Sequence, residues 1–70
     1  MSKFIEVKVQ EGIERNLYNV ALNVSMISHI EDHVDRTKGT NSIVHMLNGD
    51  WYFCDMKYRD FIRTLEHMKM

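Results

Sequence analysis

The dipeptide Asn48-Gly49 constrains the fold most, because it joins two runs of β-prone residues and is the pair best suited to a type I′ turn. Its spacing predicts a hairpin of residues 42–47 and 50–54 with a two-residue loop, in which Met46 pairs with Trp51. In that register one face of the hairpin carries Val44, Met46, Trp51 and Phe53, and the other carries Ile43, His45, Tyr52 and Cys54. Both faces are unusually apolar, so we expect both to be covered.

The chain before the hairpin alternates between apolar and polar residues. This alternation predicts a strand over residues 3–9 and, after a turn at Glu11-Gly12, an antiparallel strand over residues 15–22. Cap-forming and turn-forming residues then indicate a single helical turn that leads into a strand over residues 27–34. Residues 35–42 include no apolar side chain, which predicts a solvated loop.

After the hairpin, an apolar stripe predicts one amphipathic helix over residues 56–68, with Asp55 as its N-cap. The stripe consists of Tyr58, Phe61, Ile62, Leu65 and Met68. Residues 1–70 are thus predicted to form a single α+β domain, an antiparallel meander of four or five strands with one C-terminal helix. One helix covers one face of such a sheet. Curvature or a second subunit must shield the other face, and we therefore expect a homo-oligomer.

Length and charge exclude several classes of protein. Nine Lys and Arg residues against ten Asp and Glu residues leave a net charge of −1, which lacks the strong basic signature of a nucleic-acid or membrane-surface binder. The single cysteine, Cys54, cannot form an intramolecular disulfide, which favours a reducing compartment. The sequence shows no signal-peptide pattern and no apolar run of about 20 residues, so we expect a cytoplasmic protein.

Three segments of the sequence resemble known families. Residues 22–31, Leu-Asn-Val-Ser-Met-Ile-Ser-His-Ile-Glu, are similar to a segment shared by FlbD-type proteins of flagellar operons, LytTR-type DNA-binding modules and short phage and mobile-element proteins. Residues 42–55 resemble the hairpin of those families, and residues 58–65 resemble the helix after it. The resemblance implies a short meander with a C-terminal helix and, for the FlbD type, an accessory or regulatory role without catalytic residues. LytTR-type modules read DNA through basic loops, whereas the corresponding loop here offers only Arg36 and Lys38.

Histidine and cysteine residues are the first candidates for chemistry. His29 and His33 lie four residues apart with Glu31 between them, a set adequate for a divalent metal, but a polar strand face is the simpler interpretation. In the predicted hairpin, His45 shares a face with Cys54 and would activate that thiol if it came close, but a buried structural thiol is the better interpretation. No glycine-rich phosphate loop, metalloprotease motif or nucleophile elbow occurs, so we expect no enzyme activity, metal or cofactor.

Two sets of residues are candidate binding groups. The basic set would serve a nucleic-acid-binding regulator of LytTR-like type, and it comprises Arg36, Lys38, Lys57, Arg59 and Arg63. Ordinary solvated helix charges are the alternative interpretation of this set. The second set is apolar and adaptable, as in many partner-binding surfaces, although such residues are also common in cores, and it comprises Met46, Trp51, Tyr52 and Tyr58.

These observations favour a small, non-enzymatic interaction or regulatory module that acts through protein–protein contacts as a homo-oligomer. A nucleic-acid-binding regulator is the first alternative. The second is a small-molecule or anion binder at a subunit interface, since clefts between subunits often hold ligands.

Overall fold

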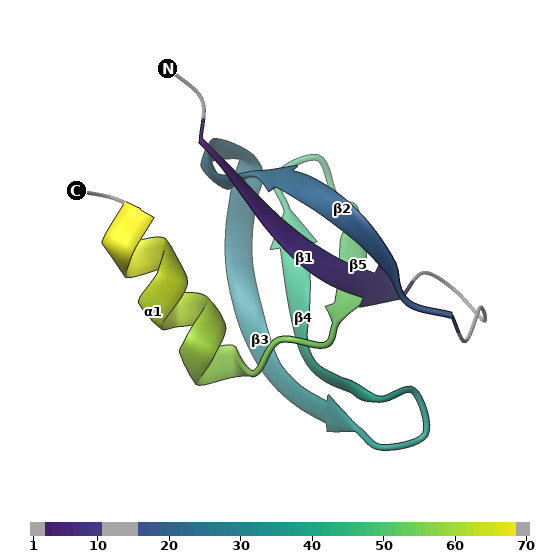
Figure 1. Cartoon of the computed structure of the whole chain (residues 1–70). Coiled ribbons are helices and arrows are strands. Elements are labelled where there is room, and N and C mark those ends of the chain that lie inside the picture. The colour runs from purple at the N-terminus through teal and green to yellow at the C-terminus, as the bar shows by residue number, and fades with distance from the viewer. Residues whose placement is uncertain (1–2, 11–15, 69–70) are drawn as a thin grey trace.

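Figure 1 shows the computed structural model of the chain, which describes residues 3–10 and 16–68. The elements are β1 (Phe4–Gln10), β2 (Tyr18–Asn23), the 3₁₀ turn η1 (Val24–Met26), β3 (Ile27–Asp35), β4 (Thr40–Met46), β5 (Trp51–Cys54) and α1 (Tyr58–Met68). The predicted α+β architecture is confirmed, with five antiparallel strands and one C-terminal helix. The turn predicted at Glu11-Gly12 lies outside the described residues.

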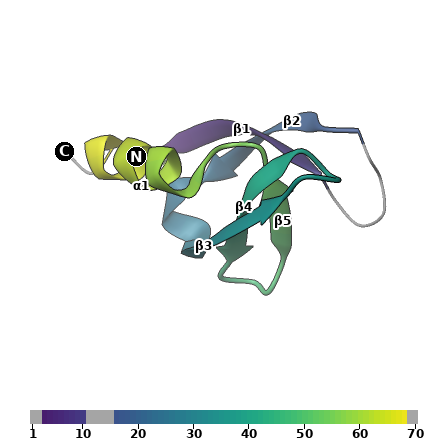
Figure 2. The same ribbon diagram turned by 90° about the horizontal axis from the view of Figure 1, so that it is seen from below.

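The five strands form one curled sheet in the order β2-β1-β5-β4-β3 (Figures 1 and 2). Strands β2 and β3 are therefore the two edges, although η1 connects them directly. Backbone hydrogen bonds fix this corner, because the Val24 N–H donates to the Lys3 carbonyl at 2.9 Å and the Leu47 N–H donates to the Met26 carbonyl at 2.8 Å. The sheet bends around its core without pairing its two edges.

The core lies between the inner face of the sheet and α1. The buried apolar residues of the main cluster are Ile5, Val7, Val9, Leu22, Val44, Cys54 and Phe61. Phe61 comes from the helix and is fully buried, which docks α1 on this face. The Asn41 side chain donates to the Asp55 carbonyl at 2.6 Å and the Ser42 hydroxyl donates to the Met56 carbonyl at 2.7 Å, so β4 also holds the segment that leads into the helix.

The β4–β5 hairpin forms as predicted, but its predicted register is wrong by one residue. His45 pairs with Trp51 and Val44 with Tyr52. The Met46 N–H donates to the Asp50 carbonyl at 2.8 Å, so the loop has three residues and not two. Its last residue, Gly49, has a φ of +97°, which glycine adopts without strain.

This shift of one residue moves every side chain of one strand to the opposite face of the hairpin. The pairing places Ile43 and His45 with Phe53 and Trp51 on the outer face of the sheet. Val44 shares the inner face with Tyr52. The two faces predicted from a two-residue loop, with Val44 beside Phe53 on one and His45 beside Tyr52 on the other, therefore do not form.

Two predicted boundaries also move. The helix begins at Tyr58 and not at residue 56, so Asp55 is not its N-cap, and the Asp55 N–H instead donates to the Lys8 carbonyl at 3.1 Å. The loop after β3 is shorter than predicted, because β4 begins at Thr40. The Asp35 carboxylate folds this loop by accepting hydrogen bonds from the Thr37 N–H at 3.0 Å and the Thr37 hydroxyl at 2.6 Å.

Candidate functional site

The outer face of β3, β4 and β5 carries a continuous group of aromatic and imidazole side chains, which we term the aromatic face. It consists of His29, Glu31 and His33 on β3, Ile43 and His45 on β4, and Trp51 and Phe53 on β5. The strand pairing arranges them in rows across the sheet: His29 beside His45 and Trp51, and Glu31 beside Ile43 and Phe53. The helix packs on the opposite face and does not cover these side chains, of which Ile43 is nevertheless buried by its neighbours and Trp51 is the most exposed apolar one.

The first row is organised by a stacked pair of histidines. The rings of His29 and His45 lie 4.1 Å apart between centroids with an interplanar angle of 10°. Nε2 of His45 lies 3.0 Å from Oε1 of Glu31, a hydrogen bond that becomes an ion pair when the imidazole is protonated. On the other ring, Nδ1 of His29 is hydrogen-bonded to the Ser28 hydroxyl at 3.1 Å. Polar contacts thus fix the orientation of both rings.

The second row centres on Phe53. Its ring meets Trp51 edge to face at 5.2 Å and His33 at 6.1 Å, both between centroids. The Lys38 ammonium lies 4.8 Å from the same centroid, a cation–π contact. Trp51 itself remains 49 % exposed. Trp51 therefore packs against Phe53 and still reaches solvent.

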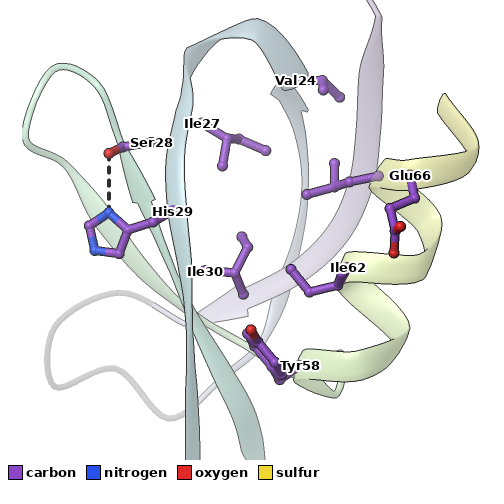
Figure 3. Close-up of a pocket in the computed structure, with 9 residues that line it drawn as sticks. Val24, Ile27, Ser28, His29, Ile30, Tyr58, Ile62 and Glu66 are labelled. Atoms are coloured by element: carbon purple, nitrogen blue, oxygen red, sulfur yellow. Dashed lines mark hydrogen bonds between the residues drawn. The ribbon is translucent and has the colours of Figure 1, made fainter. Parts of the chain in front are cut away.

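The structure separates the four residues that we predicted to bind a partner. Trp51 lies on the aromatic face, whereas Met46 and Tyr52 pack against the core. Tyr58 lines a groove between α1 and β3 (Figure 3). Sequence reasoning missed the histidines and Phe53 as members of one surface. The spacing of His29, Glu31 and His33 was the available signal, but the misplaced hairpin register hid their neighbours on β4 and β5.

The groove between α1 and β3 has a volume of about 400 Å³. Its lining is mainly aliphatic and comes from Val24, Ile27, Ile30, Ile62 and Leu65, with Ser28, His29, Tyr58 and Glu66 completing it. In Figure 3, Ile27 and Ile30 point from β3 toward α1, whereas His29 points to the opposite side. The groove and the aromatic face thus lie on opposite sides of the same edge strand.

The predicted basic set divides into two parts. Lys57, Arg59 and Arg63 line one shallow groove near the start of α1, together with Asp32 and Asp60. Arg36 is exposed in the β3–β4 loop, and Lys38 is engaged by Phe53 on the aromatic face. Three cations are therefore gathered at one place, where two carboxylates reduce their combined field.

Cys54 and the histidines do not form the reactive pair that we considered. Cys54 is fully buried on the inner face, while His45 lies on the outer face, so the sheet separates them. Burial, with a smaller contribution from Asp55, raises the pKa of the Cys54 thiol to about 12. Such a thiol is protonated at neutral pH. In the part of the chain that the structure describes, no group of three His, Cys, Asp or Glu side chains is arranged to hold a metal ion.

Comparisons of the chain with protein-family models, curated proteins and solved structures give no match. Between residues 3–10 and 16–68, the structure contains no helix that is both long and apolar enough to span a membrane.

Proposed function

We propose that this chain is a small, non-enzymatic interaction module that binds a protein partner through its aromatic face and associates with a second copy of itself. The observation that carries the proposal is the half-exposed Trp51, held by Phe53 at the end of the row that contains the stacked histidines. Trp and other aromatic side chains are enriched at the centres of protein interfaces, where they bury a large area at a low cost in side-chain entropy.

The composition of the aromatic face favours a protein over a polyanion. Its apolar centre is formed by Trp51 and Phe53 over the buried Ile43, and the charges at this centre are the Glu31 carboxylate and the ammonium of the neighbouring Lys38. These opposite charges lie around an apolar centre, as in the polar rim of a protein interface. A partner segment that places an aliphatic or aromatic side chain against Trp51 and a carboxylate near Lys38 matches this arrangement.

A nucleic-acid-binding regulator is the second candidate. It is supported by the convergence of Lys57, Arg59 and Arg63 in one groove and by the resemblance to LytTR-type modules. If this candidate is correct, replacement of Arg59 and Arg63 by Glu abolishes nucleic-acid binding, and the affinity of the unmodified chain falls steeply with salt.

The proposal is tested by capturing partners from the native cell lysate with a tagged chain, with and without nuclease. The Trp51→Ala variant removes the exposed ring of the aromatic face. Phe4→Ala is the matched control, since Phe4 is an exposed aromatic residue, at 58 %, on a strand that does not contribute to this face. We expect a stoichiometric protein that survives nuclease, is retained by Phe4→Ala and is lost with Trp51→Ala.

Two results would contradict the proposal. The first is a captured protein that is insensitive to Trp51→Ala but lost with Phe4→Ala, which would place the binding surface elsewhere. The second is recovery of nucleic-acid-associated proteins only, all lost on nuclease treatment and on replacement of Arg59 and Arg63. That result would establish the second candidate.

A further inference from the structure

Strand β3 forms one edge of the sheet and is its longest strand in the described part of the chain, with nine residues. One side of β3 pairs with β4. Along the other side, no backbone hydrogen bond joins the strand to another element within residues 3–10 and 16–68. Its free N–H and C=O groups can accept a further strand, which is the usual risk and the usual use of a sheet edge.

The side chains of β3 are arranged so that the strand complements itself. Pairing with β4 is regular from His29 to Asp32, and the irregularities of the strand lie outside this stretch. Consider two copies whose β3 strands pair antiparallel around a two-fold axis. The inner faces of the two sheets form one continuous face only if residues directly opposite each other lie on the same face. Because residues on the same face are an even number of positions apart, the midpoint between any two opposite residues is itself a residue. The axis therefore passes through a residue of the regular stretch and not between two residues.

Of the four positions in the regular stretch, only Ile30 is a centre that places an imidazole opposite a carboxylate without also opposing two carboxylates or two imidazoles. It places His29 of each copy opposite Glu31 of the other and brings the two Ile30 side chains together on the inner side. A centre at Glu31 or at Asp32 would oppose two carboxylates, and a centre at His29 would oppose two imidazoles. Like charges directly opposite each other destabilise a strand pair.

The polar atoms needed for this match are available. Nδ1 of His29 is bonded to Ser28, which leaves Nε2, and Oε1 of Glu31 is bonded to His45, which leaves Oε2. With the axis at Ile30, His29 of one copy lies directly opposite Glu31 of the other on the outer face. Nε2 of His29 can therefore bond to Oε2 of Glu31 across the pair. Two such pairs form per dimer, one on each side of the axis.

We infer that two copies of the chain pair through their β3 edges in an antiparallel, two-fold arrangement centred on Ile30. The pairing joins the two sheets and places the two aromatic faces side by side. This inference rests on the self-association in the proposed function, but not on the partner-binding role of Trp51.

The test compares three variants with the unmodified chain by sedimentation equilibrium at pH 7. His29→Glu opposes two carboxylates on each side of the axis and is expected to weaken the dimer by roughly 100-fold or more. The double variant His29→Glu with Glu31→His exchanges the two groups and restores the dimer. His33→Glu is the matched control, because it makes the same substitution on the same strand and the same face but outside the regular stretch, and it leaves the dimer intact.

A measurement without substitution covers the case in which His29→Glu does not fold. In the unmodified chain, amide hydrogen exchange at the free side of β3 is expected to slow as the protein concentration rises, while exchange on β2 stays constant. The inference is overturned by a monomer at all concentrations, by equal effects of His29→Glu and His33→Glu, or by concentration-dependent protection of β2 instead of β3. Capture of a partner that depends on Trp51 would stand in each of these cases, so failure of the inference and failure of the proposed function are distinguishable.

Discussion

Phe61 is the one fully buried side chain of α1, and its truncation gives the sharpest test of the fold. Phe61 is the largest fully buried residue and lies among the apolar residues of β1, β2, β4 and β5. Replacement of a buried Phe by Ala costs about 3–5 kcal/mol, which includes the cavity left behind. A single core in a domain of this size rarely supplies more than about 3–5 kcal/mol in total. Phe61→Ala is therefore expected to remove most of the free energy of unfolding.

Urea denaturation followed by far-UV circular dichroism measures this effect. We expect Phe61→Ala to lack a folded baseline at 25 °C, since a domain of this size loses about 1 kcal/mol of stability per molar urea. Arg63→Ala is the control on the same helix, because this exposed side chain contributes within about 0.5 kcal/mol. A loss below about 1.5 kcal/mol for Phe61→Ala would show that α1 does not complete the core in solution.

Three further predictions concern the turn, the loop and the thiol. Gly49→Ala is expected to cost about 1–2 kcal/mol in urea denaturation, because the site has open space but a φ of +97° that a side chain disfavours. The Thr37 hydroxyl lowers the pKa of Asp35 below 3.8, so the stability that this hydrogen bond contributes is present above that pH and is lost as the pH falls through the lowered pKa. Asp35→Asn should therefore reduce stability at pH 7. In thermal melts, the stability of this variant should depend less on pH in the acid range than that of the unmodified chain. Cys54 should resist a thiol reagent at pH 8 until urea is added. Because burial raises the pKa of this thiol from 9.0 to about 12, the folded state should also lose stability as the pH rises from 9 toward 12.

Local patterns in the sequence were sufficient for the elements of the fold. Alternation located β1 and β2, and the apolar stripe located the face of α1 that carries Phe61. The start of the helix was misplaced because Asp55 is a good capping residue by type, yet its backbone N–H is taken by Lys8 of β1. A contact between β1 and the segment that joins β5 to α1 has no local signature in the sequence.

The candidate site could not be assembled from the sequence for a related reason. Asn48-Gly49 fits a two-residue loop, but the observed loop also includes Leu47, whose N–H is held by Met26 of η1. A one-residue difference in loop length reverses which side chains share a face. The prediction therefore divided Trp51 and His45 between two faces, whereas the structure brings them together. The turn dipeptide alone does not decide this choice, which depends on a contact with another part of the chain.

Dimerisation through β3 would change what the aromatic face can bind. The same strand supplies His29 and Glu31 to the outer face and Ile30 to the apolar groove, so pairing at its edge continues both surfaces into the second copy. Two Trp51 side chains would then lie on one side of a continuous sheet. A partner with two binding segments would meet the second site at an effective concentration in the millimolar range, and its avidity would exceed the affinity of one face about 100-fold or more. A weak contact at each face would thus be sufficient for stable capture, and that capture would fall with His29→Glu even though the variant leaves Trp51 and Phe53 in place.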